Sequence, residues 1–202
     1  MSTIRRGRGR PPGAGATDTR AELLAAARAV FSERGFAGAG IAEIVARAGV
    51  SAPVLYHHFA GKADLYLAVA ADVYDEVLSA LEAAAAAAGG PFVGRLDAVL
   101  AAAADLNEAD PTIAGFATAL PADLRLSAEL APVRAQMARV RAFFVALATG
   151  SPDVPAHRRE AVADACPTLI AGLSRAGAIQ SSPAELRRTV ESLRLLVRGE
   201  LF

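Results

Sequence analysis

Four arginines, Arg5, Arg6, Arg8 and Arg10, stand within six positions near the N-terminus, in the stretch RRGRGRPPG. Guanidinium groups pair well with the oxygens of phosphates and carboxylates, and glycine between them leaves the backbone free to follow an extended partner. Residues 1–17 contain little that a core could bury, which predicts a flexible arm. The chemistry that this segment offers is therefore binding to a polyanion.

The charge of the chain is distributed unevenly, although its 21 Lys and Arg balance its 21 Asp and Glu. Residues 1–62 hold nine Lys and Arg against four Asp and Glu, and residues 63–202 hold 12 against 17. A net charge of +5 at one end and −5 at the other indicates that the N-terminal part faces a polyanion. Ordinary scatter of surface charge is the alternative.

Residue types that perform catalysis are few and poorly spaced. The three histidines are the adjacent His57 and His58 and the distant His157, and no pair has the i,i+4 spacing of a helical zinc site. The sequence holds no Gly-x-Ser-x-Gly elbow and no P-loop, and the glycine run at 35–40 lacks the G-x-G-x-x-G spacing. The single cysteine, Cys166, is predicted to be a packed core thiol. We therefore expect no catalytic residue, no metal site and no cofactor, and we do not expect an enzyme.

Hydrophobic residues recur at helical spacing along most of the chain, without a useful strand pattern, so the predicted fold is all-α. Alanine, the best helix former, supplies much of the 53% hydrophobic content. A capping box from Thr19 to Glu22 would begin the first helix, and Pro167 should kink or end a segment of a later one. Two short helices are expected, one over 41–48 and one after Ser51. The other expected helices span 19–34, 62–88, 92–109, 112–120, 123–148, 157–177 and 184–199.

The two short helices, joined by residues 48–51, fit a helix-turn-helix. The order of motifs around them resembles the N-terminal pattern of the tetracycline-repressor (TetR) family of transcriptional regulators. These motifs are Gly35-Phe36, Ile44-Val45, Ala48-Gly49-Val50-Ser51, Leu55-Tyr56-His57-His58-Phe59, and Lys62 with Leu65. The resemblance covers residues 18–77, and the remaining residues match only in the number and character of their helices.

The resemblance implies a flexible arm over 1–17, a three-helix DNA-binding domain over 18–77, and an effector-binding and dimerisation domain over 78–202. It also implies a homodimer that places its third helices in the major groove of double-stranded DNA and reads a palindromic operator. A small-molecule effector would change the spacing of the two heads and release the operator, which describes a repressor.

The same resemblance implies which residues touch DNA. Free N–H groups at the start of the third helix suit a phosphate, while Leu55 and Phe59 pack inward. Where the family usually has hydroxyl residues before the second helix, this chain has Ala39-Gly40, and Val54 stands where the family often has Thr. The reading face therefore offers methyl contacts to thymine but no bidentate base contact. The DNA-binding residues expected in the head are Gly40, Ser51, Ala52, Pro53, Val54, Tyr56, His57 and Lys62.

The arginine arm resembles the Gly-Arg-Pro core of an AT-hook, an extended peptide that lies in a narrow A·T minor groove. Such grooves carry an enhanced negative potential that attracts arginine. Arg6, Arg8 and Arg10 are therefore expected to contact the minor groove beside each half-site. A basic tail that attracts DNA without sequence preference is the alternative.

The C-terminal half carries enough apolar surface to line a ligand cavity of a few hundred Å³, or to form an ordinary core. Few polar residues lie among the candidates, so the expected effector is small and hydrophobic. The candidate effector-binding residues are Phe92, Leu96, Leu100, Phe116, Leu120, Met137, Arg141 and Phe144.

Apolar stripes on the last two helices are expected to form a four-helix dimer interface, with burial inside the monomer as the alternative. The interface candidates are Leu169, Leu173, Val190, Leu193, Leu196 and Val197.

These inferences combine into a cytoplasmic, dimeric, ligand-responsive regulator that binds DNA and no membrane. Two alternatives stay open at this point. One is a DNA-binding regulator without a small-molecule effector, controlled by a protein partner, and the other is a helical enzyme or carrier.

Overall fold

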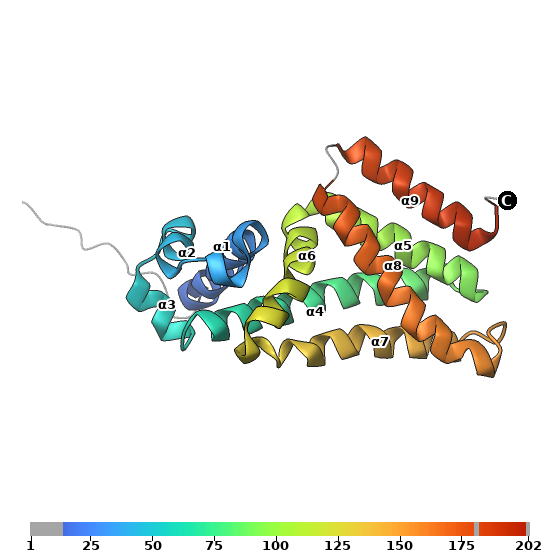
Figure 1. Cartoon of the computed structure of the whole chain (residues 1–202), viewed down its shortest axis with the longest axis horizontal. Coiled ribbons are helices and arrows are strands. Elements are labelled where there is room, and N and C mark those ends of the chain that lie inside the picture. Colours follow the sequence, from blue (N-terminus) through green and yellow to red (C-terminus); the bar gives the residue numbers. More distant parts are fainter. Residues whose placement is uncertain (1–13, 180–181, 201–202) are drawn as a thin grey trace, which may run out of the picture.

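The computed structural model describes residues 14–179 and 182–200. Within these ranges the chain is helical and contains no strand, which confirms the predicted all-α fold (Figure 1). The elements in chain order are α1 (Ala14–Gly38), α2 (Ile41–Ala48), α3 (Ala52–His58), α4 (Lys62–Ala88), α5 (Phe92–Ala109), α6 (Pro111–Leu126), the short 3-10 turn η1 (Ala128–Leu130), α7 (Val133–Thr149), the 3-10 turn η2 (Ala156–Arg158), α8 (Arg159–Ile179) and α9 (Pro183–Arg198).

The helices form an elongated molecule with α1, α2 and α3 at one end (Figure 1). We call these three helices the head. The long helix α4 begins at the head and continues along the molecule, where it packs against α5 and α7. Helix α6 packs between α1 on one side and α8 on the other, and α9 packs mainly on α5. The head is therefore attached to the rest of the chain through two helices, α4 and α6.

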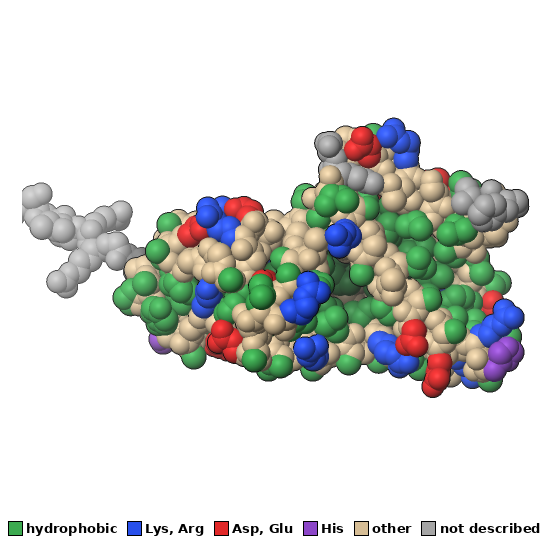
Figure 2. All heavy atoms as spheres, in the orientation of Figure 1, with side chains coloured by type: hydrophobic (Ala, Val, Ile, Leu, Met, Phe, Trp, Pro, Cys, Tyr) green, Lys and Arg blue, Asp and Glu red, His purple; other side chains and the backbone are tan. Residues whose placement is uncertain are grey.

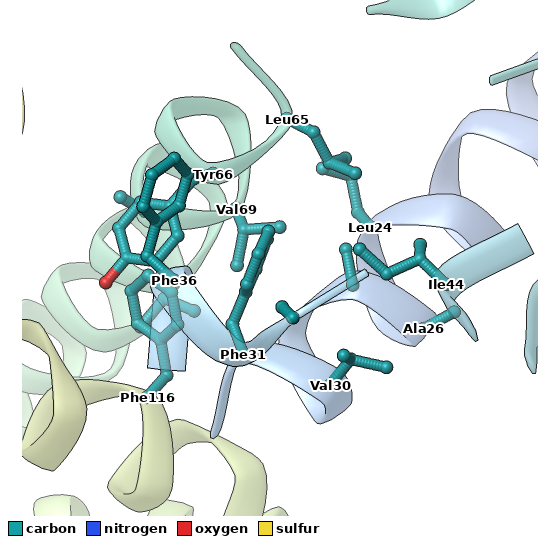
Figure 3. Close-up of a cluster of buried hydrophobic side chains, with 14 of the residues drawn as sticks. Leu24, Ala26, Val30, Phe31, Phe36, Ile44, Leu65, Tyr66, Val69 and Phe116 are labelled. Carbon is teal, nitrogen blue, oxygen red and sulfur yellow. The ribbon is translucent and has the colours of Figure 1, made fainter. Parts of the chain in front are cut away.

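The first hydrophobic core joins the head, the first half of α4, and α6. Tyr66 of α4 lies at its centre, and its ring centroid is 4.8 Å from that of Phe31, 5.4 Å from that of Phe36 and 4.9 Å from that of Phe116. Figure 3 shows the rings of Tyr66, Phe36 and Phe116 close together, with Phe31 and Val69 beside them. Because Phe116 belongs to α6, the core of the head is completed by a residue outside the predicted DNA-binding domain of residues 18–77.

The second hydrophobic core lies between the later part of α4 and helices α5, α7, α8 and α9. Along α4 the buried residues pass from the first core to the second between Val73 and Leu78. Tyr74 and Val77 are half-buried and pack against both cores. These two side chains form the junction between the cores.

Several helix boundaries follow the predicted signals. α4 has the predicted limits, and Gly49 ends α2 in the left-handed conformation with φ 68°. Asp110 caps α6 by accepting from the Thr112 N–H at 2.9 Å, and Pro111 occupies the first turn. Local chemistry decides these ends without help from the rest of the fold.

The first helix begins earlier than expected. α1 begins at Ala14 rather than at Thr19, so the predicted capping box lies inside the helix and four residues of the predicted arm are helical. The predicted end after Arg34 is confirmed, because Gly35 breaks the helical course with φ 64°, and a short helical segment continues from there to Gly38.

Two predicted breaks in the C-terminal half are wrong, because α6 continues through Pro121 to Leu126 and α8 continues through Gly177 to Ile179. The predicted helix over 123–148 is also wrong, since α6 ends at Leu126 and α7 begins at Val133. Pro167 lies inside α8, so it does not end that helix. A proline inside a helix costs about 3 kcal/mol, but α6 packs against α1 and α8 on its two sides, which holds the helix together. At Gly177 an added Cβ would lie 3.6 Å from the Ala114 Cβ, an ordinary van der Waals distance, so a side chain is tolerated and the helix can continue through this position.

Candidate nucleic-acid interface

The turn between α2 and α3 places the two helices as a helix-turn-helix. The Gly49 N–H donates to the Ala46 carbonyl at 3.3 Å, and the Val50 N–H donates to the Val45 carbonyl at 3.0 Å. These bonds satisfy carbonyls at the end of α2, as glycine in the left-handed conformation allows. Ile44 of α2 and Leu55 of α3 are both fully buried and fix the two helices on the same core.

Helix α3 presents its polar side outward, as the sequence predicted. Leu55 is buried, and Phe59 at the C-cap is 3% exposed. Tyr56 is 56% exposed although it is a large aromatic residue, and His57 is exposed beside it. Because nothing in the described part of the chain covers this face, a phenol and an imidazole are available to a partner. Figure 2 shows a histidine at the surface of this end of the molecule.

The first turn of α3 is accessible as well. Ser51 and Pro53 are exposed, whereas Ala52 and Val54 are half-buried. Ser51 is the N-cap residue with an extended backbone, but its side chain makes no hydrogen bond to the helix. Its hydroxyl therefore does not serve as a helix cap.

Gly40 is the N-cap of α2 and is exposed, with φ −109° and ψ 139°. Any residue can adopt this backbone, and an added Cβ would have no heavy atom within 4 Å. The fold does not require glycine here, so the missing hydroxyl reduces the hydrogen bonds available to a partner.

Lys62 is placed differently from the other predicted contact residues. Its Nζ donates to the carbonyls of Phe36 at 2.8 Å and Ala39 at 3.0 Å, and lies 4.5 Å from the centroid of the Phe36 ring. The half-buried ammonium therefore connects the start of α4 to the joint between α1 and α2. Of its three N–H donors only one is left for a phosphate.

The other described cations of the head are also engaged within the protein. Arg47 donates to both carboxylate oxygens of Glu33, at 2.6 and 3.0 Å, and this bond lowers the pKa of Glu33. Arg34 pairs with Glu43 at 2.9 Å. The guanidinium of Arg20 lies 5.4 Å from the centroid of the Phe59 ring. A partner with negative charge must therefore compete with contacts that the head already makes.

The remaining predicted contacts, Arg6, Arg8 and Arg10, lie outside the described residues. Their weight in the charge balance is nevertheless clear from the sequence. Residues 1–17 contain four arginines and no acidic residue, whereas residues 18–62 contain five Lys and Arg against four Asp and Glu. The positive charge of the N-terminal part thus belongs almost entirely to the arm.

The structure does not bring the predicted effector-binding residues together. Phe116 and Leu120 belong to the first core, whereas Phe92, Leu96, Leu100 and Phe144 belong to the second. Met137 is 42% exposed on α7, and Arg141 is exposed and pairs with Asp164 at 3.0 Å.

Two surface hollows lie away from these residues. One, of about 430 Å³, is lined by Glu185, Arg188, Thr189 and Ser192 on α9. The other, of about 220 Å³, lies between α1 and α4 and includes Leu24 and Asp72. Neither contains a predicted effector-binding residue.

Most of the predicted dimer contacts are part of the monomer core. Leu173 and Val190 are buried, while Leu169, Leu193 and Val197 are half-buried against the second core. Only Leu196, 46% exposed, faces outward among this group. Two of the six candidates are therefore buried within the monomer, and the other four keep exposed surface.

Charged contacts attach α9 to α5. Arg194 donates to both carboxylate oxygens of Asp97 at 2.8 Å, and Arg198 donates to the same carboxylate at 3.1 Å. The hydrogen bonds from Arg194 are the largest cause that lowers the pKa of Asp97. Arg187 also donates to Glu108. α9 is thus fixed to the same subunit along its length.

Cys166 is 4% exposed, and burial raises the pKa of its thiol to about 11. The prediction of a packed core thiol is therefore confirmed, because a reactive thiol needs access and a lowered pKa. Among the residues that the structure describes, no group of three or more His, Cys, Asp and Glu could hold a metal ion. No helix in the described ranges is long and apolar enough to cross a membrane.

Sequence patterns missed one polar residue of this region. Asp123 of α6 is 5% exposed and accepts from the Phe36 N–H and from the Tyr66 hydroxyl, each at 2.9 Å. Burial and then the bond to Asp123 raise the pKa of Tyr66 well above its usual range. A lone acidic residue after a proline carries no motif, so only the folded structure could identify it.

Comparison with known proteins agrees with this geometry. The family model for bacterial regulatory proteins of the tetR family matches residues 23–69, which include the helix-turn-helix. Over 87 residues the chain is 45% identical to the transcriptional activator FasR of Mycolicibacterium smegmatis, covering 40% of each chain. Over 54 residues it is 39% identical to the transcriptional repressor AcnR of Corynebacterium glutamicum, covering 27% of this chain and 29% of that protein. The chain thus matches less than half the length of these two relatives, which are regulators of transcription rather than enzymes.

A solved structure extends the likeness to the C-terminal half. SCO4454, a TetR-family transcriptional regulator from Streptomyces coelicolor, has a TM-score of 0.69 and 23% identity. The alignment covers 92% of this chain and 97% of that one. At this identity the similarity establishes the fold of the helical bundle behind the head.

Proposed function

We propose that this chain, whose residues 23–69 match the family model for bacterial regulatory proteins of the tetR family, is a member of that family, binds double-stranded DNA as a homodimer and regulates transcription. The observation that carries the proposal is the helix-turn-helix whose second helix buries Leu55 and exposes Tyr56 and His57. Such a helix enters the major groove, and two related by a two-fold axis read a palindrome. An operator-binding protein works where the chromosome is, so action in the cytoplasm is part of the same proposal.

The DNA contacts in this proposal fall into two groups. Ser51, Ala52, Pro53 and Val54, with Gly40 from the preceding loop, approach the groove at the first turns of α2 and α3. Tyr56 and His57 reach the phosphate backbone, which sets register and affinity but carries little sequence information. Lys62 contributes at most its remaining N–H donor.

The arm supplies most of the electrostatic attraction. The described cations of the head have partners within the protein, and residues 1–17 carry a charge of +4. Arg6, Arg8 and Arg10 follow the narrow minor groove beside each half-site and favour A·T flanks. The competing proposal is a tail that attracts any duplex equally.

The dimer requires a surface that the monomer leaves free. The exposed side of α8 and Leu196 of α9 are available for it, since Leu173 and Val190 already pack inside the subunit. Two such helices from each subunit would form the four-helix interface.

We propose that the effector binds only at the junction of the two cores. Tyr74 lies there half-buried, and burial raises the pKa of its hydroxyl to about 12. A small hydrophobic molecule with one polar group would suit this site. Its binding would separate the cores along α4 and move the heads.

A regulator without an effector is the second candidate function. It is favoured by one observation, namely that Leu100, Phe116 and Phe144 are fully buried in packed cores. The sign of regulation follows from the position of the operator, and the relatives include both an activator and a repressor. Repression is therefore tested by transcription from the selected operator.

The first experiment selects binding sites from a random duplex library and titrates the best sequence at several salt concentrations. A palindrome with half-sites about one helical turn or more apart is expected. Tyr56→Ala should weaken binding to every sequence alike with little change in the salt slope, because a neutral phenol that contacts a phosphate releases no counterion. Weak binding with no consensus sequence would overturn the proposal.

The arm is tested with a matched pair of variants. In one, Arg6, Arg8 and Arg10 are replaced by glutamine, and in the other by lysine, which keeps the charge but lacks the planar guanidinium. Minor-groove contact predicts that both variants lose the preference for A·T flanks. A lysine variant indistinguishable from the original chain would identify the arm as a non-specific tail.

A further inference from the structure

Asp123 is a buried carboxylate that receives one hydrogen bond from α1 and one from α4. It accepts from the backbone N–H of Phe36 and from the hydroxyl of Tyr66, each at 2.9 Å. Tyr66 is itself fully buried. A carboxylate inside an apolar core is costly unless its oxygens receive hydrogen bonds, so this site tolerates few replacements.

The backbone at Gly35 is shaped to allow this contact. Its φ of 64° breaks the regular course of α1 and turns the Phe36 N–H toward α6. An added Cβ on Gly35 would lie 3.0 Å from Asp123 Oδ1, so a larger residue would be strained by its φ and would crowd the carboxylate. The kink and the carboxylate therefore form one structural unit.

Phe36 is the joint between α1 and the helix-turn-helix. Its N–H is held by Asp123 of α6, and its carbonyl accepts from Lys62 of α4 at 2.8 Å. α2 begins five residues later, at Ile41. Both helices that connect the head to the bundle thus hold the same residue at the entrance to α2.

Helix α6 also follows α1 along its length before it reaches this joint. Asp110 at the start of α6 pairs with Arg28. One turn further along α1, Gly115 lies so close to Ser32 that an added Cβ would be 2.8 Å from the Ser32 Cβ. The contact between Asp123 and Phe36 is the last of these, and it is the one nearest α2.

We propose that Asp123 is a positioning residue that sets the orientation of the helix-turn-helix relative to the bundle, and thereby the half-site spacing that the dimer accepts. The proposal rests on the proposed function of a dimeric DNA reader. Asp123 touches no DNA. It acts by fixing the backbone of Phe36 to α6, so that movement of α6 is passed to the head directly as well as through α4.

The variant Asp123→Asn separates this role from simple packing. An amide carries no charge and has only one acceptor oxygen, so the variant loses the charge-assisted bonds and keeps the contact with Tyr66 only if the hydroxyl turns to accept from the NH₂ group. Tyr66→Phe removes one bond and leaves the other in place. Asp153→Asn is the matched control, because Asp153 accepts from the Phe92 N–H at 3.0 and 3.1 Å at the start of α5, in the second-core half of the chain.

The experiment measures the affinity of the full chain for a set of duplexes. All contain the two half-sites found by selection, and the spacing between them changes one base pair at a time. The original chain should prefer one spacing. Asp123→Asn should reduce that preference by about tenfold, the equivalent of one charge-assisted hydrogen bond, and Tyr66→Phe should reduce it less. Asp153→Asn should keep the spacing preference, even if its melting temperature falls as much as that of Asp123→Asn.

Each result decides between the possibilities. A spacing preference that is unchanged in Asp123→Asn, at a lowered melting temperature, would make Asp123 a structural residue only and overturn the proposal. Where Asp123→Asn does not fold, an unchanged preference in Tyr66→Phe overturns it in the same way. If the original chain binds no palindrome at any spacing, the proposed function fails together with this inference.

Discussion

Lys62 uses two of its three N–H donors on the carbonyls of Phe36 and Ala39, although its position in the motif suggests a role at DNA. The sequence motif therefore predicts that Lys62 contacts DNA, whereas the structure shows that it contacts the protein's own backbone. The difference matters because the two roles predict different effects of the same substitution.

Lys62→Met should destabilise the fold by about 1–3 kcal/mol, since two carbonyls lose a charged donor and the Phe36 ring loses its cation. Urea unfolding would measure this change. Arg20→Met serves as the control, because Arg20 is exposed and its described contact is with the Phe59 ring. If Lys62→Met leaves the stability unchanged and lowers the salt slope of DNA binding by about one per subunit, Lys62 binds a phosphate as the motif suggests.

Cys166 gives a residue-level prediction about pH. Its folded-state pKa of about 11 lies above its ordinary value near 9, so the folded protein binds this proton more tightly than the unfolded chain does. The resulting stability is present below about pH 9 and is lost as the pH rises toward 11. The difference in unfolding free energy between the original chain and Cys166→Ala should therefore shrink over that window.

The slope of that difference should approach about 1.4 kcal/mol per pH unit. Comparing the two chains at each pH cancels the titration of the three tyrosines, which both chains share. If the difference in unfolding free energy between the two chains stays constant from about pH 8 to about pH 11, the raised pKa of the Cys166 thiol is contradicted.

At the scale of the helices, the close crossing of α1 and α6 depends on a residue without a side chain. Gly115→Ala would bring a Cβ to 2.8 Å from the Ser32 Cβ, so the helices must separate. We expect a loss of about 1–3 kcal/mol in the free energy of unfolding, typical of overpacking.

The double variant Gly115→Ala with Ser32→Gly moves the side chain from one helix to the other. It should recover part of the lost stability, beyond what the two single variants predict by addition. Purely additive effects in denaturant unfolding would mean that steric contact between α1 and α6 is not the cause.

The same helices show what could be predicted from the sequence. Ends set by local chemistry, such as Gly49 and the Asp110-Pro111 pair, are predictable because glycine and capping residues act within one turn. Pro121 and Gly177 are misleading because packing on both sides of α6 and α8 continues those helices. The outward face of α3 follows from helical periodicity alone.

The contacts of the joint could not be predicted in this way. Lys62 lies 26 residues from Phe36, and Asp123 lies 87 residues from it. No spacing rule connects residues so far apart in sequence. Both roles become visible only when α4 and α6 are placed against the same residue.

At the scale of the whole molecule, two cores share one long helix. The 27 residues of α4 run from the first core into the second, and Tyr74 and Val77 contact both. Because this junction is the main apolar connection along α4, unfolding of the two halves is coupled through it.

Tyr74→Ala should remove part of that connection and destabilise the protein by about 2 kcal/mol, below the range for a fully buried aromatic residue. Calorimetry should then give a van't Hoff enthalpy smaller than the calorimetric enthalpy, since the halves no longer unfold together. Leu147→Ala, a cavity confined to the second core, provides the comparison. Equal enthalpies for Tyr74→Ala would show that the contacts of α6 couple the halves on their own.

The backbone of Phe36 also has a consequence for spectroscopy. Amide protons near the end of a helix usually exchange quickly with deuterium, because such ends open with little cost. The Phe36 amide, two residues before the end of α1, is instead held by a buried carboxylate of α6. Its exchange rate therefore reports, at one backbone position and without DNA, how often the head separates from the bundle.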